Sequence, residues 1–216
     1  MKKVLIIGAN GKIGKILVSK MKDGEDFTPV AMIRKEEQKD YFNNLNVETV
    51  LESLEGEVKP LSEAMKGMDA VVFSAGSGGN TGQDKTLTVD LDGAVKTMEA
   101  AKQAGVSRYV IVSALGTDDR TFWEKSGIKP YYVAKHFADK TLKSIGLDYT
   151  IVRPGRLLDE EGNGKITTVE PASKESVPRE DVATVIYESL LNDSTIGKII
   201  EFNQGDTDIK NAVASI

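Results

Sequence analysis

Short apolar runs alternate with longer segments of helical period along most of the chain. Valine and isoleucine occupy successive positions in these runs, which indicates strands that are covered on both faces. Parallel strands joined by right-handed helical crossovers produce this alternation. The runs that we expect to be strands are Val4–Ile7, Val30–Ile33, Val47–Leu51, Ala70–Ser74, Tyr109–Ser113, Tyr149–Val152 and Lys198–Phe202.

Helical stretches fall between these runs, and some end at a glycine that can adopt the left-handed cap conformation, such as Gly105 and Gly146. The pattern predicts an α/β fold, a doubly wound parallel sheet of about seven strands with helices on both faces and a small C-terminal cap region. Residues 153–178 are less regular and are expected to form a loop and a short strand over a ligand crevice. The expected helices are Gly11–Met21, Lys35–Leu45, Leu61–Lys66, Thr86–Ala104, Tyr131–Ser144 and Arg179–Leu191.

Length and composition narrow the class of protein. The chain has 216 residues, 40% of them apolar, which favours a single domain over 1–216. Its net charge of −5 offers no positive field for nucleic acid or anionic lipid. No apolar run is long enough to span a bilayer, and the run that begins at Val4 ends after four residues in a glycine loop. We therefore expect a cytoplasmic protein with a small-molecule substrate, either a monomer or a homodimer.

The chain contains no cysteine and a single histidine, His136. Disulfides, thiolate catalysis and metal sites rich in cysteine or histidine are thereby excluded within one chain. We expect no metal.

A glycine loop follows the first expected strand directly and opens an amphipathic helix. In this context Gly8 permits the tight turn, Gly11 lets the backbone approach a pyrophosphate, and Gly14 lets the helix pack close to the sheet. The helix N-terminus supplies free N–H groups and a partial positive charge to the phosphates. The loop predicts a Rossmann-type nicotinamide-nucleotide site formed by Gly8, Asn10, Gly11, Lys12, Ile13 and Gly14.

The end of the second strand separates NADP(H) from NAD(H), because an acidic residue there binds the ribose 2′-hydroxyl and a basic one accommodates a 2′-phosphate. Arg34 occupies this position and can bind phosphate through two parallel hydrogen bonds. Lys12 and Lys35 could add positive charge from either side. The residues favour NADP(H), while the nearby Glu36 and Glu37 keep NAD(H) as the alternative.

The chain resembles the short-chain dehydrogenase/reductase superfamily, and within it the atypical, extended-like members described as NAD(P)H-binding or NmrA-like. The likeness covers nearly the whole chain. Besides the glycine loop, its landmarks are Phe73–Gly76, Tyr109–Ala114, Tyr131–Lys135, Tyr149–Gly155 and Pro178–Ala183.

The resemblance implies an active site of Tyr131, Lys135 and Ser113, with Asp90 at the helix position that is usually Asn. Residues four apart share a helix face, so the Lys135 ammonium is expected to lower the pKa of Tyr131 towards neutrality. Tyr131 would exchange a proton with a carbonyl or carbinol while Ser113 orients its oxygen. An ionised Asp90 accepts hydrogen bonds and donates none, so the water relay of the usual Asn does not follow.

The resemblance also implies further contacts with the cofactor. Relatives commonly carry Asp for the adenine where this chain has Ser53, so we expect Ser53 and the Leu54 backbone to substitute. Lys135 would hold the ribose hydroxyls. The remaining implied contacts are Ser74, Ala75, Gly76, Pro154 and Gly155.

Several other residues have two interpretations or a structural one. Phe122 and Trp123 could stack on a flavin or quinone, or pack their own loop. His136 is expected on the surface or with its hydrogen bonds satisfied. Arg179 and Asp181 are expected to serve the start of a helix, and Asp159–Glu161 to form a solvated turn.

The first hypothesis is an NADPH-dependent oxidoreductase acting on a small carbonyl, quinone or flavin-type substrate. Two alternatives remain: an epimerase or dehydratase-like enzyme that uses transient hydride transfer, and an NADP(H)-binding redox sensor without turnover. The departure at Asp90 motivates the sensor.

Overall fold

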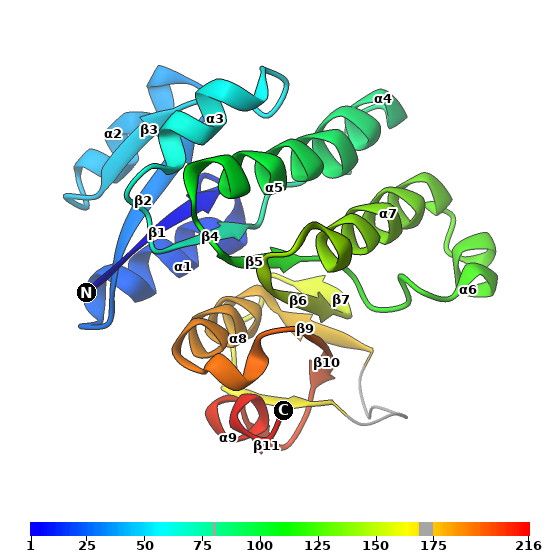
Figure 1. The fold of residues 1–216 in the computed structure, drawn as a ribbon. Helices are drawn as coiled ribbons and strands as arrows, with labels where there is room; N and C mark the ends of the chain where they lie inside the picture. Colours follow the sequence, from blue (N-terminus) through cyan, green and yellow to red (C-terminus); the bar gives the residue numbers. More distant parts are fainter. Residues whose placement is uncertain (80, 169–174) are drawn as a thin grey trace.

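The computed structural model describes residues 1–79, 81–168 and 175–216 of the chain. In this part of the chain a nine-stranded sheet forms the centre of the fold, in the order β11-β8-β10-β6-β5-β4-β1-β2-β3 (Figure 1). Strands from β10 to β3 pair in parallel. These are β1 (Lys2–Ile7), β2 (Phe27–Ile33), β3 (Glu48–Leu51), β4 (Ala70–Phe73), β5 (Arg108–Val112), β6 (Asp148–Pro154) and β10 (Lys198–Gln204).

The α/β fold class and the parallel sheet of about seven strands are confirmed, and two short antiparallel strands bring the sheet to nine. Strands β8 (Lys165–Thr167) and β11 (Thr207–Asp208) extend the sheet beyond β10 by antiparallel pairing. Strands β7 (Arg156–Leu158) and β9 (Ser176–Pro178) form a separate parallel pair. Each has only two or three residues, too few for a period to be recognised in the sequence.

These short strands correct the prediction for the irregular segment. Residues 153–178 were expected to form a loop and one short strand, but the structure has three short strands there, β7, β8 and β9. Residues 169–174 of this segment lie outside the described residues.

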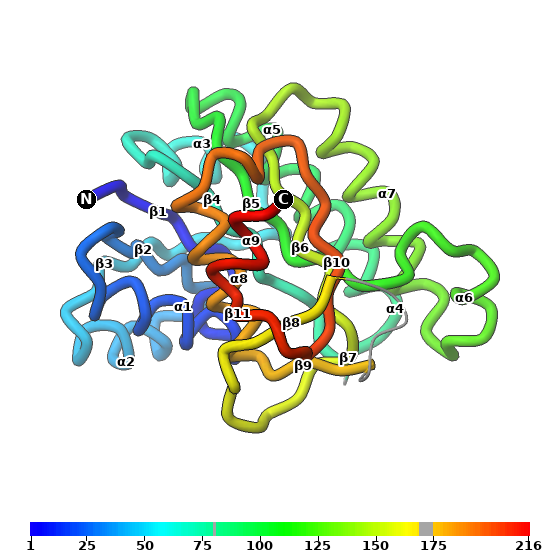
Figure 2. The backbone as a smooth tube through the Cα atoms, turned by 90° about the horizontal axis from the view of Figure 1, so that it is seen from below, coloured from blue at the N-terminus to red at the C-terminus, as the bar shows by residue number. Residues whose placement is uncertain are grey.

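Helices cover both faces of the sheet (Figures 1 and 2). One hydrophobic core lies between the sheet and α3, α5 and α7, and a second lies on the side of α1, α2, α8 and α9. The helices are α1 (Lys12–Asp23), α2 (Lys39–Asn43), α3 (Val58–Met65), α4 (Gln83–Lys85), α5 (Asp92–Ala104), α6 (Arg120–Lys125), α7 (Lys129–Ile145), α8 (Arg179–Leu191) and α9 (Ile209–Ala214).

Helix α1 illustrates why the sequence folds in this way. Its apolar side chains Ile13, Leu17 and Met21 recur every four residues, so they share one face, and all three are buried. The helix begins at Lys12, directly after β1 and the glycine loop.

Two helical predictions need correction, and three short helices were not predicted. The single helix expected over Thr86–Ala104 is divided into a π-helical segment, Thr86–Leu91, and α5. The helix expected over Lys35–Leu45 is a 3-10 turn, Glu36–Gln38, followed by the short α2. Helices α4, α6 and α9 were not predicted, since three to six residues show too little periodicity.

Candidate active site

Two cavities lie side by side at the carboxyl ends of the parallel strands. The first, of about 340 Å³, is lined by the last residues of β1 and β2 and by the segments that follow β1, β2, β3 and β4. The second, of about 570 Å³, is lined from the starts of α1 and α8, the end of β5 and α7. Both include Ser74, Ala75, Gly76 and Ser77, directly after β4. The cavities therefore form one crevice where the strand order reverses between β1 and β4.

The glycine loop fits tightly against its neighbours. Gly8 has a positive φ of 84°, and a Cβ there would lie 2.6 Å from the Ala75 nitrogen. A Cβ at Gly14 would lie 2.3 Å from the Gly8 carbonyl oxygen. Both positions therefore require glycine for close backbone packing.

The N-terminus of α1 opens beside the crevice. Gly11 is the N-cap of this helix, and within the described chain no side chain caps it. Gly11 lines the first cavity, and the first helical residues Lys12 and Ile13 line the second. Free N–H groups at a helix N-terminus favour phosphate, so this end of α1 fits a pyrophosphate.

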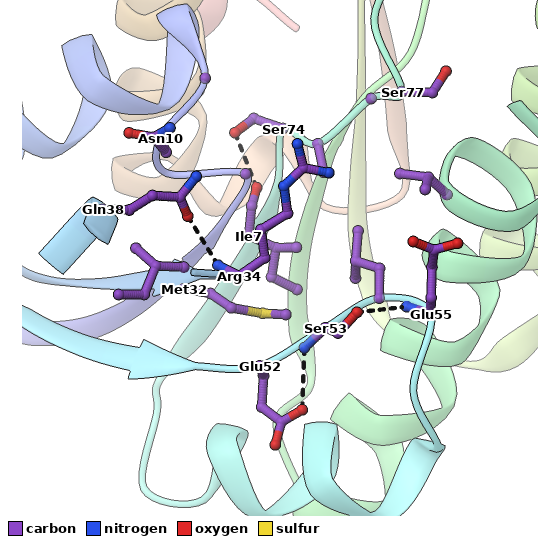
Figure 3. A pocket seen from close by; sticks show the side chains of 17 residues that line it. Ile7, Asn10, Met32, Arg34, Gln38, Glu52, Ser53, Glu55, Ser74 and Ser77 are labelled. Atoms are coloured by element: carbon purple, nitrogen blue, oxygen red, sulfur yellow. Dashed lines mark hydrogen bonds between the residues drawn. The ribbon is translucent and has the colours of Figure 1, made fainter. Parts of the chain in front are cut away.

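Arg34 lies among the residues that line the first cavity (Figure 3). Its backbone N–H donates to Gln38 Oε1 at 3.0 Å, and among the described residues its guanidinium forms no ion pair. The two neighbouring carboxylates are engaged elsewhere: Glu52 accepts from the Ser53 N–H, and Glu55 pairs with Lys85 at 2.5 Å. The Arg34 guanidinium is thus available for a phosphate.

The other cations predicted beside Arg34 lie elsewhere. Lys12 lines the second cavity, and Lys35 lines neither of the two. Ser53 and Leu54, expected near the adenine, do line the first cavity. A 2′-phosphate in this cavity would depend on Arg34.

All four predicted catalytic residues, Tyr131, Lys135, Ser113 and Asp90, line the second cavity. Asp90 comes from the π-helical segment, and α7 carries Tyr131 and Lys135 on one face. Lys135 donates to the Val112 carbonyl at 3.0 Å, and its Nζ lies 3.9 Å from Asp90 Oδ1. The π-helical segment packs against α7, which brings Asp90 to Lys135.

The predicted lowering of the Tyr131 pKa is wrong. Burial, and after it the Asp90 carboxylate, raises the pKa of Tyr131 above its ordinary value. The Lys135 Nζ lies 5.8 Å from the Tyr131 ring centre and donates to the Val112 carbonyl. Burial also lowers the pKa of Lys135. Tyr131 therefore holds its proton at neutral pH.

Ser113 is engaged by a residue that the sequence analysis missed. Its hydroxyl donates to Asp139 Oδ2 at 2.8 Å, and Asp139 also accepts from Arg153 Nε at 3.0 Å. Asp139 and Arg153 are both buried. The spacing of Tyr131, Lys135 and Asp139, four residues apart on α7, was the signal that could have revealed this group.

Two predicted cofactor contacts lie away from the crevice. Neither Pro154 nor Gly155 lines the two cavities. A Cβ at Gly155 would overlap the side chain of Asn203, so packing explains this glycine.

Of the two aromatic residues in α6, Phe122 and Trp123, one has a clear structural role. Trp123 is buried, and its indole N–H donates to the Gly116 carbonyl at 3.1 Å. Phe122 stays partly exposed and contacts the Tyr132 ring edge to face. Neither residue lines the two cavities.

His136 and Asp159 have defined partners. His136 Nδ1 lies 3.2 Å from the Thr117 carbonyl, in agreement with a satisfied histidine. Asp159 was expected in a solvated turn, but it bridges Lys12 at 2.5 Å and Arg179 at 2.6 Å. Its partners come from distant parts of the sequence, so no local pattern predicts them.

Two further findings concern metal binding and membrane spans. Among residues 1–79, 81–168 and 175–216, no cluster of histidine and carboxylate side chains could hold a metal ion. In the same ranges, every helix is too short or too polar to cross a membrane.

The strand order, the glycine loop and the crevice at the switch point together define a Rossmann-type, NAD(P)-binding protein of the short-chain dehydrogenase/reductase kind. The chain belongs to the NAD(P)H-binding family, whose model matches residues 8–193. The atypical subgroup of that superfamily, predicted from the motifs, is confirmed.

Similar proteins carry two kinds of name. The Bacillus subtilis protein called "Uncharacterized sugar epimerase YhfK" is 47% identical over 99% of this chain and 100% of its own. A Bacillus halodurans structure, provisionally named an NAD-dependent epimerase/dehydratase, has a TM-score of 0.91 and 42% identity, with 100% of both chains covered. The Lactococcus lactis oxidoreductase ylbE has a TM-score of 0.89 and 37% identity over 99% of this chain and 96% of its own.

Proposed function

We propose that this protein is an NADPH-dependent reductase of a small carbonyl, quinone or flavin-type substrate. The observation that carries the proposal is the position of Tyr131, Lys135 and Asp90 in a cavity that continues into the dinucleotide crevice. The name of the Lactococcus lactis relative, an oxidoreductase, agrees with it.

Tyr131 is the proposed proton donor. When bound, the reduced nicotinamide supplies a hydride to the carbonyl carbon. Tyr131 gives its phenolic proton to the carbonyl oxygen, so that the carbonyl becomes an alcohol and the phenolate regains a proton from solvent. The phenol is protonated at neutral pH, which is the state that reduction requires, and its raised pKa by itself makes it a weaker acid.

Ser113 has a narrower role than the resemblance implies. Its hydroxyl proton points to Asp139, so Ser113 offers lone pairs to a ligand in the second cavity. Ser113 would then accept a hydrogen bond, for example from Tyr131 or from the alcohol product.

The preference for NADPH rests on Arg34. Its guanidinium lies in the first cavity, and both nearby glutamates have other partners. A 2′-phosphate would give it a charge-assisted, bidentate contact.

Replacement of Tyr131 by Phe tests the mechanism. The variant should lose about 10²-fold to 10⁴-fold in turnover of a carbonyl and quinone panel, because the proton donor is removed. NADPH affinity, measured by fluorescence titration, should stay unchanged. Tyr132→Phe is the matched control, since Tyr132 lines neither cavity. Full activity in Tyr131→Phe would remove Tyr131 from the mechanism.

Epimerisation is the second candidate, favoured by the name of the Bacillus subtilis relative. An epimerase returns the hydride to its product and consumes no cofactor overall, whereas a reductase oxidises one NADPH for each product. Stoichiometric loss of NADPH absorbance with substrate therefore separates the two.

A redox sensor is the third candidate, favoured by the engagement of Ser113 with Asp139. A sensor requires unequal affinity for NADPH and NADP⁺, since only differential binding shifts a conformational equilibrium. Equal affinities by calorimetry, together with turnover, would contradict it.

A further inference from the structure

Two cations from distant elements meet at one carboxylate beside the second cavity. Lys12 is the first residue of α1, and Arg179 is the first residue of α8. Lys12 Nζ lies 2.5 Å from Asp159 Oδ2, and Arg179 Nη1 lies 2.6 Å from Asp159 Oδ1. One carboxylate thus fills the space between an ammonium and a guanidinium.

Lys12 and Arg179 line the second cavity, whereas Asp159 lines with them a neighbouring, more open cavity of about 1070 Å³. Lys12 and Arg179 are both among the residues that line the second cavity, together with Tyr131. Asp159 is absent from that lining, and its side chain is 58% exposed. A ligand in the cavity can therefore reach the cations that Asp159 holds from outside.

Asp159 is held near the cations by a segment that is anchored on α8. The Gly162 N–H donates to Glu180 Oε2 at 2.9 Å, and the Gly164 N–H donates to Asp181 Oδ1 at 2.9 Å. Asp181 was expected to serve the start of the helix, and it also secures this segment. The Lys12 and Arg179 charges hold the pKa of Asp159 below its usual range, so the carboxylate is ionised at neutral pH.

The exposed carboxylate is a weak competitor for these cations. Ion pairs between exposed side chains contribute little, because water solvates the separated charges nearly as well. Arg179 is only 23% exposed, and a guanidinium binds a planar carboxylate or a phosphate through two parallel hydrogen bonds. A ligand anion inside the cavity would be better shielded from water than Asp159.

We propose that Lys12 and Arg179 bind an anionic group of the second substrate, a carboxylate or phosphate, and that Asp159 occupies these cations until the substrate arrives. This inference rests on the proposed function and names its substrate class: a small carbonyl compound that carries an anionic end. The cavity wall between the two ends includes Ile128, Pro130 and Leu157, which suits an apolar body.

The pyrophosphate of the cofactor is the other source of an anion at this place, since Lys12 begins α1. The test therefore uses protein saturated with NADP⁺ and a matched pair of probes, 4-carboxybenzaldehyde and methyl 4-formylbenzoate. Binding of each is measured by calorimetry, and reduction of each is measured with NADPH in a separate arm.

We expect the acid to bind more tightly than the ester. Arg179→Gln should weaken binding of the acid about tenfold and leave the ester unchanged, because one charge-assisted contact is lost. Asp159→Asn should strengthen binding of the acid, since the internal competitor loses its charge. Lys22→Gln is the control, an α1 cation that does not line these cavities or the one that contains Asp159. Arg179→Lys keeps the positive charge and should retain part of the binding of the acid. Thermal unfolding of every variant shows whether it is folded.

Equal binding of acid and ester, or binding of neither, would overturn the inference. A loss of NADP⁺ affinity in Arg179→Gln as large as the loss for the acid would assign the cations to the cofactor instead. The proposed function can fail independently of the anion site. If the acid binds more tightly than the ester but neither aldehyde is reduced, the anion site is supported and the reductase function is contradicted. If both aldehydes are reduced but bind equally, the reductase function is supported and the anion site is contradicted.

Discussion

Asp139 connects the candidate catalytic residues to a buried charge network. It accepts from Ser113 and from Arg153, while Arg153 also donates to Asp118 and Glu201, each at 2.8 Å. Burial raises the pKa of Asp139, and the Arg153 charge opposes that rise. At the residue scale, the position of Ser113 therefore depends on a carboxylate that lines neither of the two cavities.

Replacement of Asp139 by Ala should destabilise the protein. Arg153 would lose its buried partner, and breaking a buried ion pair costs about 3 kcal/mol or more. Urea unfolding measures the loss. Glu201→Gln is the control, because Glu201 is 47% exposed and its pair with Arg153 is open to water. The control should cost less than about 1 kcal/mol. Equal losses in both variants would show that Asp139 has no special structural role.

Arg34→Gln should weaken NADPH binding about tenfold or more, because the 2′-phosphate loses a charged partner. NADH lacks this phosphate, so its affinity should change little. Fluorescence titration with both cofactors provides the measurement. Lys35→Gln serves as the control, since Lys35 does not line the cavity. A wild-type preference for NADH would contradict the assignment of NADP(H).

At the scale of elements, the close approach of α1 to the glycine loop positions the proposed pyrophosphate site. Only a residue without a Cβ leaves room between Gly14 and the Gly8 carbonyl. The helix N-terminus is aimed at the crevice by this contact, and the loop is in turn fixed by Gly8 against Ala75 after β4.

Replacement of Gly14 by Ala should push α1 away from the loop. We expect a stability loss of about 1–3 kcal/mol, typical of overpacking, together with weaker binding of NADPH. Gly79→Ala is the control for stability, because a Cβ at Gly79 would meet no atom within 4 Å. Thermal unfolding and cofactor titration measure the two effects. An unchanged Gly14→Ala variant would show that the loop relaxes freely.

At the scale of the whole molecule, helices on both faces bury the sheet and the groups beside it. Tyr109 of β5 is fully buried against Thr97 of α5, with 2.7 Å between their hydroxyl oxygens. Burial raises the pKa of Tyr109, as it does that of Tyr131. Both phenols therefore remain protonated in the folded protein at a pH where an unfolded chain would release these protons.

This difference predicts a stability that is lost in alkali. Below about pH 10, the ordinary pKa of tyrosine, the folded and unfolded chains hold these protons equally and the contribution is constant. Above that pH the unfolded chain is deprotonated first, so the free energy of unfolding falls as pH rises towards the folded pKa. Urea unfolding from about pH 8 to 11 should show the decline.

Tyr109→Phe and Tyr131→Phe should each flatten this decline, whatever their effect at neutral pH. Tyr41→Phe is the control, because Tyr41 is 40% exposed. A decline that all three variants share equally would have to arise from other groups.

The local pattern of residues determined the order of strands and helices along the chain and the position of the glycine loop. The apolar runs predicted the seven parallel strands, and the glycine spacing after β1 predicted the loop that lines one end of the crevice, because strand burial and the strand-to-helix turn depend on residues near one another. The spacing of Tyr131 and Lys135 likewise placed them on one face of α7.

The tertiary structure decided what depends on distant partners. It set Asp90 beside Lys135 and raised the pKa of Tyr131, against the expectation from helix spacing alone. It also engaged Ser113 with Asp139 and joined Asp159 to cations at the starts of α1 and α8. Burial and charge act through space, so the protonation and partners of these groups follow from the assembled fold rather than from their neighbours along the chain.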